Sequence, residues 1–425
     1  MTSPLYGAAS ESWHFVKGSL RVVTQGSRGY FAWLLLLFVV IGVGLTAWIQ
    51  QLQYGLAVTH MRDQLSWGFY IGNFAFLVGI AAAAVVLVIP AYVYRWEPIR
   101  EVVLLGELMA VAAMIMCILF VTIDLGRPDR IWHMMPILGR PNFPGSLLVW
   151  DVFVLTAYFV LNYFIVTYLV FMSYRGKKYS PNFILPLVFL SIPLAVSIHT
   201  VTAFLFMGLK ARPFWNSAIL APRFLASAFV SGPALLVLVF LVVRRVRPVR
   251  ISDEALQTIG KLLAYTMSIN LFFLGCEVFR EFYAPTAHTI HAHFQWFGVE
   301  DNASIAVYTW FALTVEVLAL LVFLVPELRQ RTRLLASACV LAFVGVFIEK
   351  GLGLLLPGMT PDVIGEVYHY VPSLHEVLIG LGVWGIGALL YTLMVKVTTA
   401  ISMGEFRHRA LDPSGPHAGG ISNVG

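Results

Sequence analysis

The stretch VVLLGELMAVAAMIMCILFVTID, from Val102 to Asp124, decides the class of this protein. An α-helix needs about 20 predominantly apolar residues to cross the hydrocarbon core of a bilayer, and this stretch is long enough. Its interior holds one charged side chain, that of Glu107. Nine other stretches are similar in length and composition. The ten expected membrane-spanning helices cover residues 30–52, 66–94, 101–124, 146–174, 182–209, 219–244, 256–281, 303–325, 333–353 and 373–399.

The composition of the whole chain also indicates an integral membrane protein. Hydrophobic residues make up 59% of the 425 positions, charged residues 12%, and the mean hydropathy is +0.82. The net charge of +6 comes from bases in short loops between apolar stretches, so we expect no nucleic-acid partner. Cys117, Cys276 and Cys339 lie singly within apolar stretches, which argues against a disulfide framework and against a zinc or iron–sulfur site. Any metal centre that exchanges electrons with the chain is expected in a partner protein.

The distribution of Lys and Arg predicts the orientation in the membrane. Eighteen of these residues lie in the terminal segments and in the loops after the second, fourth, sixth and eighth helices. Nine lie on the opposite side, where we count Arg223 and Lys350, and Lys261 lies within a helix. By the positive-inside rule, both termini are cytoplasmic. We expect residues 1–29 to precede an uncleaved first helix and residues 405–425 to form a flexible cytoplasmic tail.

Ionisable side chains within the expected helices gather toward one end. A charge in hydrocarbon is costly, so such residues usually mark a pathway or a pocket. The predicted orientation places this end near the extracytoplasmic face, where we expect a polar cavity. The residues concerned are Asp124, Asp151, His199, Glu277, Glu349, His375 and Glu376.

The connection after the third helix, DLGRPDRIWHMMP from Asp124 to Pro136, is unusually rich in charge. One interpretation is an interfacial loop whose Arg and Trp side chains lie among the lipid headgroups. The other is a lid, built on Asp124 and Arg127, over a pocket for an amphipathic ligand. The position of Asp124 favours the lid, because this residue precedes the Gly-Arg-Pro break and so ends a helix at membrane depth.

The fifth expected helix contains SIPLAVSIHTVTAF, from Ser191 to Phe204, with His199 at membrane depth. Pro193 removes a backbone donor, and hydroxyl groups such as that of Thr202 are available as partners. His199 makes either a hydrogen bond between helices or a contact to a quinone, since imidazole can bond a carbonyl and accept a proton near neutral pH. Haem b is not expected, because bis-histidine ligation needs paired histidines and only one good candidate is present.

Other polar positions allow two interpretations each. Tyr70 follows Gly68 at the start of the second helix and could bond a quinone carbonyl, whereas the glycine fits close packing. Acids spread through the membrane, such as Glu107 and Glu316, form either a proton route or structural ion pairs, for example with Lys261. No metal site is expected.

The histidines of the loop after the seventh helix also have two interpretations. His288, His291 and His293 are either a metal-ligand run or surface histidines that contact a partner. Their alternate spacing and the lack of a nearby Cys favour the second.

Several motifs in a fixed order point to a known family. They are DLGRP from Asp124, NFPGSLLVWD ending at Asp151, SIHTVTAFLF around His199, APRFLASAF from Ala221, and NLFF from Asn270 followed by Glu277. Together they resemble the NrfD/PsrC family, the membrane subunits of polysulfide-reductase-like respiratory complexes. The resemblance covers roughly helices two to ten and is nearest to the ten-helix branch that includes DsrP and HmcC.

The resemblance implies an all-α membrane domain over residues 30–404. Two four-helix bundles would cover about 66–209 and 219–353, with peripheral helices at 30–52 and 373–399. It also implies a bacterial or archaeal cytoplasmic membrane protein, without haem or iron–sulfur cluster, that binds menaquinone or ubiquinone near the periplasmic face. Its implied partners are membrane lipid, a periplasmic ferredoxin-like iron–sulfur protein, and the multihaem cytochrome c and haem b subunits of a sulfur-metabolism complex.

Carried onto this sequence, the resemblance makes Asp124 and His199 the catalytic residues of a quinone site. Quinol oxidation releases protons as well as electrons, so it needs bases beside the quinol oxygens and a route to water. A structural membrane anchor for an extracytoplasmic redox enzyme, or a secondary transporter, would also show buried acids. The expected quinone contacts are Tyr70, Asp124, Arg127, Asp151, His199 and Thr202, and the expected proton path is Glu107, Asp151, Glu277, Glu316 and Glu349.

Overall fold

The computed structural model describes residues 4–407, apart from 101, 136, 248, 250, 284, 287, 288, 300–302 and 363. Within these residues all regular elements are helical, and ten helical spans are long and apolar enough to cross a membrane. The predicted fold class is therefore confirmed. The long helices are α2 (Arg28–Tyr54), α3 (Phe69–Val88), α5 (Val103–Asp124), α6 (Leu147–Tyr174), α7 (Pro181–Met207), α8 (Leu220–Val246), α9 (Asp253–Tyr283), α11 (Ser304–Leu324), α13 (Thr332–Lys350) and α15 (Leu374–Ser402).

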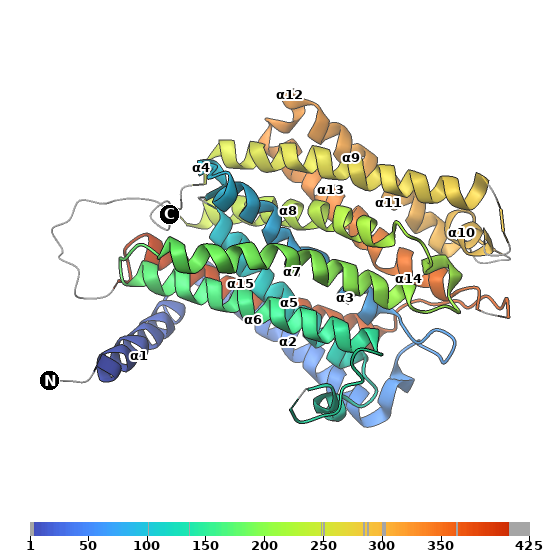
Figure 1. The fold of residues 1–425 in the computed structure, drawn as a ribbon, viewed down its shortest axis with the longest axis horizontal. Coiled ribbons are helices and arrows are strands. Elements are labelled where there is room, and N and C mark those ends of the chain that lie inside the picture. Colours follow the sequence, from blue (N-terminus) through green and yellow to red (C-terminus); the bar gives the residue numbers. More distant parts are fainter. Residues whose placement is uncertain are drawn as a thin grey trace.

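The long helices lie side by side with similar axes, so that the molecule has two distinct ends (Figure 1). The helix α1 (Pro4–Val23) and the last turn of α15 lie at one, which we call the terminal end. The other, which we call the loop end, has α10 (Thr289–Trp296) and α14 (Leu352–Met359) beside irregular connections. Two further short helices are α4 (Glu97–Arg100) and α12 (Pro326–Arg329).

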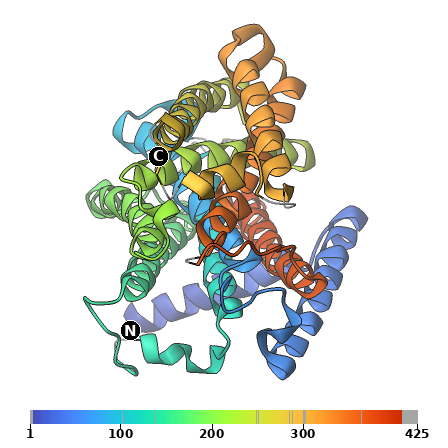
Figure 2. The same ribbon diagram turned by 90° about the vertical axis from the view of Figure 1, so that its right-hand side faces the viewer.

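Two rings of four helices form most of the structure. Helices α3, α5, α6 and α7 contact one another in a first ring, and α8, α9, α11 and α13 contact one another in a second. The rings join where α3 packs on α8. Helix α2 packs mainly on α15, which in turn contacts α5, so this pair lies against the first ring (Figure 2).

The α2–α15 pair is held together by a close approach of two glycines. A Cβ atom at Gly44 would lie 2.6 Å from the Cα of Gly382, so no larger residue fits there without a shift of the helices. The start of α15 is fixed locally by a capping box, in which Ser373 accepts from the backbone of Glu376 and Glu376 accepts from the backbone of Ser373.

The structure adds helices that the hydropathy pattern does not predict, among them α1, α10 and α14. Helix α1 occupies much of the segment expected as a plain cytoplasmic leader, and α10 lies in the loop after α9. The ninth span does not end at residue 353 but breaks at Gly351 and continues as α14. A Cβ at Gly351 would lie 2.6 Å from the carbonyl oxygen of Phe347, which accounts for a glycine at this break.

Candidate functional site

His199 and two neighbours form a buried polar group in the first ring, which we call the His199 group: Asp151, His199 and Thr202. The imidazole is completely buried, and its Nδ1 lies 3.1 Å from the carbonyl oxygen of Ala195 one turn earlier. A carbonyl only accepts, so Nδ1 carries the proton and Nε2 is left as an acceptor. No described residue donates to Nε2. The group therefore holds a buried nitrogen acceptor without a donor among the described residues.

The carboxylate of Asp151 on α6 is linked to the helix of His199 by Thr202. The hydroxyl of Thr202 lies 2.8 Å from Oδ1 of Asp151 and 2.7 Å from the carbonyl oxygen of Ile198. Asp151 is in the second turn of α6 and 2% exposed. His199 and Thr202 are three positions apart on α7, which puts them on one face of that helix.

Tyr70 and Asp124 belong to a different polar group at the loop end. The hydroxyl of Tyr70 donates to Gln51 on α2 over 2.6 Å, and the Gln51 amide donates to the carbonyl of Ile123 over 2.9 Å. Asp124 is the next residue; its Oδ1 is buried without a hydrogen-bond partner among the described residues. No described hydrogen bond or ion pair joins this group to the His199 group. The described hydrogen bonds therefore place these residues in two polar groups, one at the loop end and one around His199.

A third group of side chains ties the loop end together, and we call it the Tyr370 latch: His60, Phe69, Tyr370 and Glu376. The carboxylate of Glu376 accepts from the backbone of His60 over 3.0 Å and from the hydroxyl of Tyr370. The same hydroxyl accepts from the backbone N–H of Phe69 over 2.8 Å. Burial and the adjacent carboxylate raise the pKa of Tyr370. The latch joins the chain before α3 to the chain before α15.

The second ring contains a buried charge cluster, which we call the Arg223 group: Arg223, Asn270, Glu277, Glu316 and Glu349. The guanidinium of Arg223 pairs with Glu277 and lies 2.6 Å from Oε1 of Glu349. Asn270 donates to the other oxygen of Glu349 over 3.2 Å. Arg223 and Lys350 were counted among the loop residues of the extracytoplasmic side. They lie within α8 and α13 and are 7% and 4% exposed. The orientation count was wrong for these two residues.

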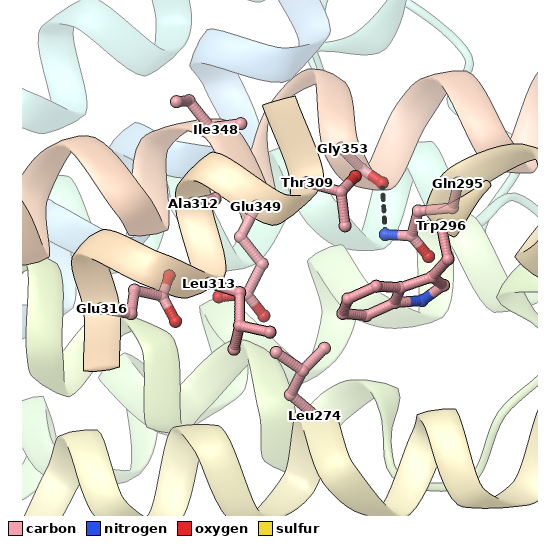
Figure 3. Close-up of a pocket in the computed structure, with 10 residues that line it drawn as sticks. All are labelled: Leu274, Gln295, Trp296, Thr309, Ala312, Leu313, Glu316, Ile348, Glu349 and Gly353. Carbon is pink, nitrogen blue, oxygen red and sulfur yellow. Dashed lines mark hydrogen bonds between the residues drawn. The ribbon is translucent and has the colours of Figure 1, made fainter. Parts of the chain in front are cut away.

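A small pocket lies against the Arg223 group, between α9, α10, α11 and the α13–α14 break (Figure 3). Glu316 and Glu349 are on its wall, with Thr309 and Gln295 toward the loop end. The room that it offers to water is about 10 Å³, which is enough for one water molecule at most. This pocket belongs to the second ring and does not adjoin the His199 group.

Two predicted site residues lie away from these groups. Arg127 is exposed and pairs with Asp129 inside the loop, at 2.9 and 3.0 Å, and it lowers the pKa of that carboxyl. It makes no described hydrogen bond to Asp124. Glu107 is 17 residues before Asp124 on α5, or about 26 Å along a helix at 1.5 Å per residue. It is 2% exposed near the terminal end, and its Oε2 has no described hydrogen-bond partner.

Of the loop histidines that the structure describes, His291 differs from its prediction as a surface residue, whereas His293 is exposed as predicted. His291 is 6% exposed on α10, and its Nδ1 lies 2.8 Å from the carbonyl oxygen of Pro357. His293 is exposed and lies against the rings of Phe282 and Phe297. His288 lies outside the described residues. Among those described, no group of three or more His, Cys, Asp or Glu side chains is arranged to hold a metal ion.

The fold and its buried polar groups define a polytopic helical membrane protein, and comparison gives its family. The chain belongs to the polysulphide reductase NrfD family, whose model matches residues 57–361. This stretch contains α3 to α14, and therefore both rings.

Relatives of similar length match most of the chain. It is 29% identical, over 84% of its length and 88% of the relative's, to the membrane protein of a putative dimethyl sulfoxide reductase from Halobacterium salinarum. It is 23% identical to one of the subunits of selenate reductase from Mesobacillus selenatarsenatis, over 86% of this chain and 93% of the relative. It is 21% identical to an Hdr-like menaquinol oxidoreductase integral membrane subunit of Archaeoglobus fulgidus, over 88% of this chain and 94% of the relative.

Proposed function

We propose that the chain is the quinone-reactive membrane subunit of a multisubunit oxidoreductase and that its quinone site includes the His199 group. The observation that carries this proposal is Nε2 of His199, an acceptor in a fully buried imidazole to which no described residue donates. A quinol hydroxyl is a matching donor. The name of the Archaeoglobus fulgidus relative, a menaquinol oxidoreductase subunit, supports a quinone as the substrate.

In quinol oxidation His199 acts as the first base. Its Nε2 accepts a hydrogen bond from a quinol hydroxyl and then its proton, and the neighbouring carboxylate of Asp151 stabilises the imidazolium. Asp124 accepts the second proton at the loop end, with Tyr70 beside it. The two electrons pass to a metal centre of a partner protein. Quinone reduction uses the same groups as proton donors.

The partner docks at the loop end in this proposal, and that end faces the periplasm. The Lys and Arg distribution supports this orientation, even after Arg223 and Lys350 are removed from the count. The partner is a ferredoxin-like iron–sulfur protein, within a sulfur-metabolism complex of the DsrP kind that also has multihaem cytochrome c and haem b subunits. The resemblance of the ordered motifs supports this assembly.

Protons move between the quinone site and water through buried acids in this proposal. Asp151 is linked to the helix of His199 through Thr202, whereas Glu277, Glu316 and Glu349 line the second ring and Glu107 lies toward the terminal end. Because His199 is completely buried, a quinone enters only if α6 or α7 shifts. Pro193 removes one backbone hydrogen bond of α7 less than two turns before His199, which weakens the helix at that level.

The test is quinol oxidation by the native assembly. The tagged chain is purified with its co-purifying partners, and reduction of their metal centres by a menaquinol analogue is followed by absorbance. We expect His199→Ala to slow this reduction at least roughly 100-fold, the lower range for loss of a general base. Replacement of the exposed His14 by Ala is the control and should leave the rate unchanged. Equal rates in His199→Ala and wild type would favour a structural anchor instead.

A further inference from the structure

The Arg223 group and the adjacent Lys350 together hold an unbalanced set of buried charges. The cations are Arg223 and Lys350, and the carboxylates are those of Glu277, Glu316 and Glu349. All five side chains are at least nine-tenths buried. If every group were ionised, the cluster would have one negative charge in excess. An uncompensated buried charge is expensive, and one bound proton cancels it.

The surrounding contacts show which carboxylate would hold that proton. Glu277 and Glu349 both form ion pairs with Arg223, so both are stabilised as anions. Glu316 is completely buried, and neither of its oxygens has a hydrogen-bond donor among the described residues. It lies within hydrogen-bonding reach of Glu349. Two carboxylates in such contact repel when both are ionised, whereas a proton on one of them converts the contact into a hydrogen bond.

The pocket gives this carboxylate room for one water molecule. Figure 3 shows the carboxyl groups of Glu316 and Glu349 near one another on the pocket wall, with Thr309 and Gln295 toward the loop end. The Gln295 amide is held by the carbonyl of Gly353 over 3.1 Å. Space for a single water molecule is enough for proton transfer and too little for an organic substrate. The polar lining and the small size fit a proton rather than a larger ligand.

Lys350 connects this site with the first ring. It follows Glu349 in the chain, and its Nζ donates to the carbonyl of Phe224 over 3.1 Å. The same Nζ lies 3.3 Å from the position that a Cβ would occupy at Gly79 of α3. Its charge is within electrostatic reach of both His199 and Glu349. A positive charge at Lys350 therefore acts on both rings at their junction.

We propose that Glu316 is a proton-binding site, with one proton held against Glu349, and that Lys350 couples the loss of this proton to protonation of His199. The coupling rests on the proposed quinone reaction, but the proton on Glu316 does not. When His199 takes a proton from quinol, a new positive charge appears near Lys350. The added charge stabilises the anionic cluster, so Glu316 releases its proton to the pocket. Such coupling between two sites is reciprocal, so an ionised Glu316 also favours a protonated His199.

Infrared spectroscopy of the purified native assembly tests the resting state. A protonated carboxyl has a C=O stretch distinct from carboxylate bands, and deuterium exchange shifts it. We expect Glu316→Gln to lose one such band relative to wild type, and Glu316→Asp to retain a shifted band. Glu327→Gln, at an exposed carboxylate, is the matched control and should lose none. If Glu316→Gln leaves the carboxyl bands unchanged, Glu316 holds no proton and the inference fails.

A second measurement tests the role of Lys350. Addition of the menaquinol analogue to the wild-type assembly should remove the Glu316 band. In Lys350→Met the band should persist after the addition, whereas in Lys350→Arg it should disappear as in wild type. Melting curves of the variants identify any that do not fold. A wild-type band that persists while quinol is oxidised would overturn the coupling. An intact Glu316 band with no quinol oxidation would instead count against the proposed function, so the two failures are distinguishable.

Discussion

The two rings of helices stabilise their buried polar groups in different ways. In the first ring, the His199 group is held by hydrogen bonds: Nδ1 of His199 contacts the carbonyl of Ala195, and the hydroxyl of Thr202 contacts Asp151 and the carbonyl of Ile198. Nε2 of His199 has no donor among the described residues. In the second ring, Arg223 links two carboxylates by charge. The first arrangement leaves an acceptor available to a ligand, whereas the second holds its side chains together. The difference supports the proposal that a ligand binds in the first ring, whereas the second ring holds paired buried charges.

The largest effect is expected where the charge pairing is broken. Arg223→Met leaves the paired carboxylates buried without a cation, so we expect a loss of about 3–5 kcal/mol in stability. Thermal unfolding in detergent measures it. Arg244→Met, on the same helix with an exposed partner, is the control and should shift the melting point little. Equal shifts in the two variants would show that Arg223 stabilises the second ring no more than a surface residue does.

The Tyr370 latch lies at the loop end, where it includes the first residue of α3, and it should affect stability alone. Tyr370→Phe removes the acceptor for the Phe69 N–H and the donor to Glu376, at a cost of about 1–3 kcal/mol. We expect a lower melting point with an unchanged rate of quinol oxidation per folded molecule. A reduced rate at full stability would extend the quinone site to the latch and would weaken the contrast between the rings.

A smaller effect is expected from Asp151→Asn. The amide oxygen can still accept a hydrogen bond from the hydroxyl of Thr202, so the geometry is kept while the negative charge of the His199 group is lost. We expect quinol oxidation to slow roughly tenfold, which corresponds to about 1.4 kcal/mol of transition-state stabilisation. Steady-state rates with the menaquinol analogue measure it, and Asn162→Asp on the same helix tests whether any change of charge in α6 has this effect. An unchanged rate in Asp151→Asn would remove Asp151 from the reaction.

The smallest effect is expected at Arg127. Its partner Asp129 is exposed, so Arg127→Ala should leave both the melting point and the rate of quinol oxidation unchanged. The pKa of Asp129 is lowered in the folded protein, so any stabilisation by this pair is present above the usual aspartate pKa and is lost as the pH falls. Wild type and variant should therefore unfold alike at acid pH. A slower rate in the variant would show that this loop acts on the quinone or on the partner.

Hydropathy alone predicts the ten spans of this fold, because each span must by itself be long and apolar enough to cross the bilayer. It does not predict α1, which has 20 residues but is too polar to span a bilayer, or α14, which has only 8 residues. It does show Arg223 and Lys350 inside the expected sixth and ninth helices, and that position is a signal that both are buried. The prediction that these two cations lie in loops did not take their position within the expected helices into account.

The candidate site is less predictable than the fold, for a physical reason. Depth along a helix can be estimated from the sequence, but the direction of a side chain around the bundle depends on packing. Asp124 and His199 lie in the same half of the molecule, yet their described contacts belong to different groups. Similarly, the link from Tyr70 to Gln51 joins helices whose adjacency no short motif reveals. The catalytic and quinone-contacting roles of these residues remain predictions.

The pairing of α2 with α15 has a consequence for biosynthesis. The first spanning helix enters the bilayer early, but its main neighbour is the last to be translated. Until α15 arrives, the surface around Gly44 faces lipid, and a ribosome that stalls before residue 374 leaves α2 without this neighbour. The close approach of Gly44 and Gly382 therefore forms only after α15 has been inserted, so the packing of α2 depends on a helix translated long after it.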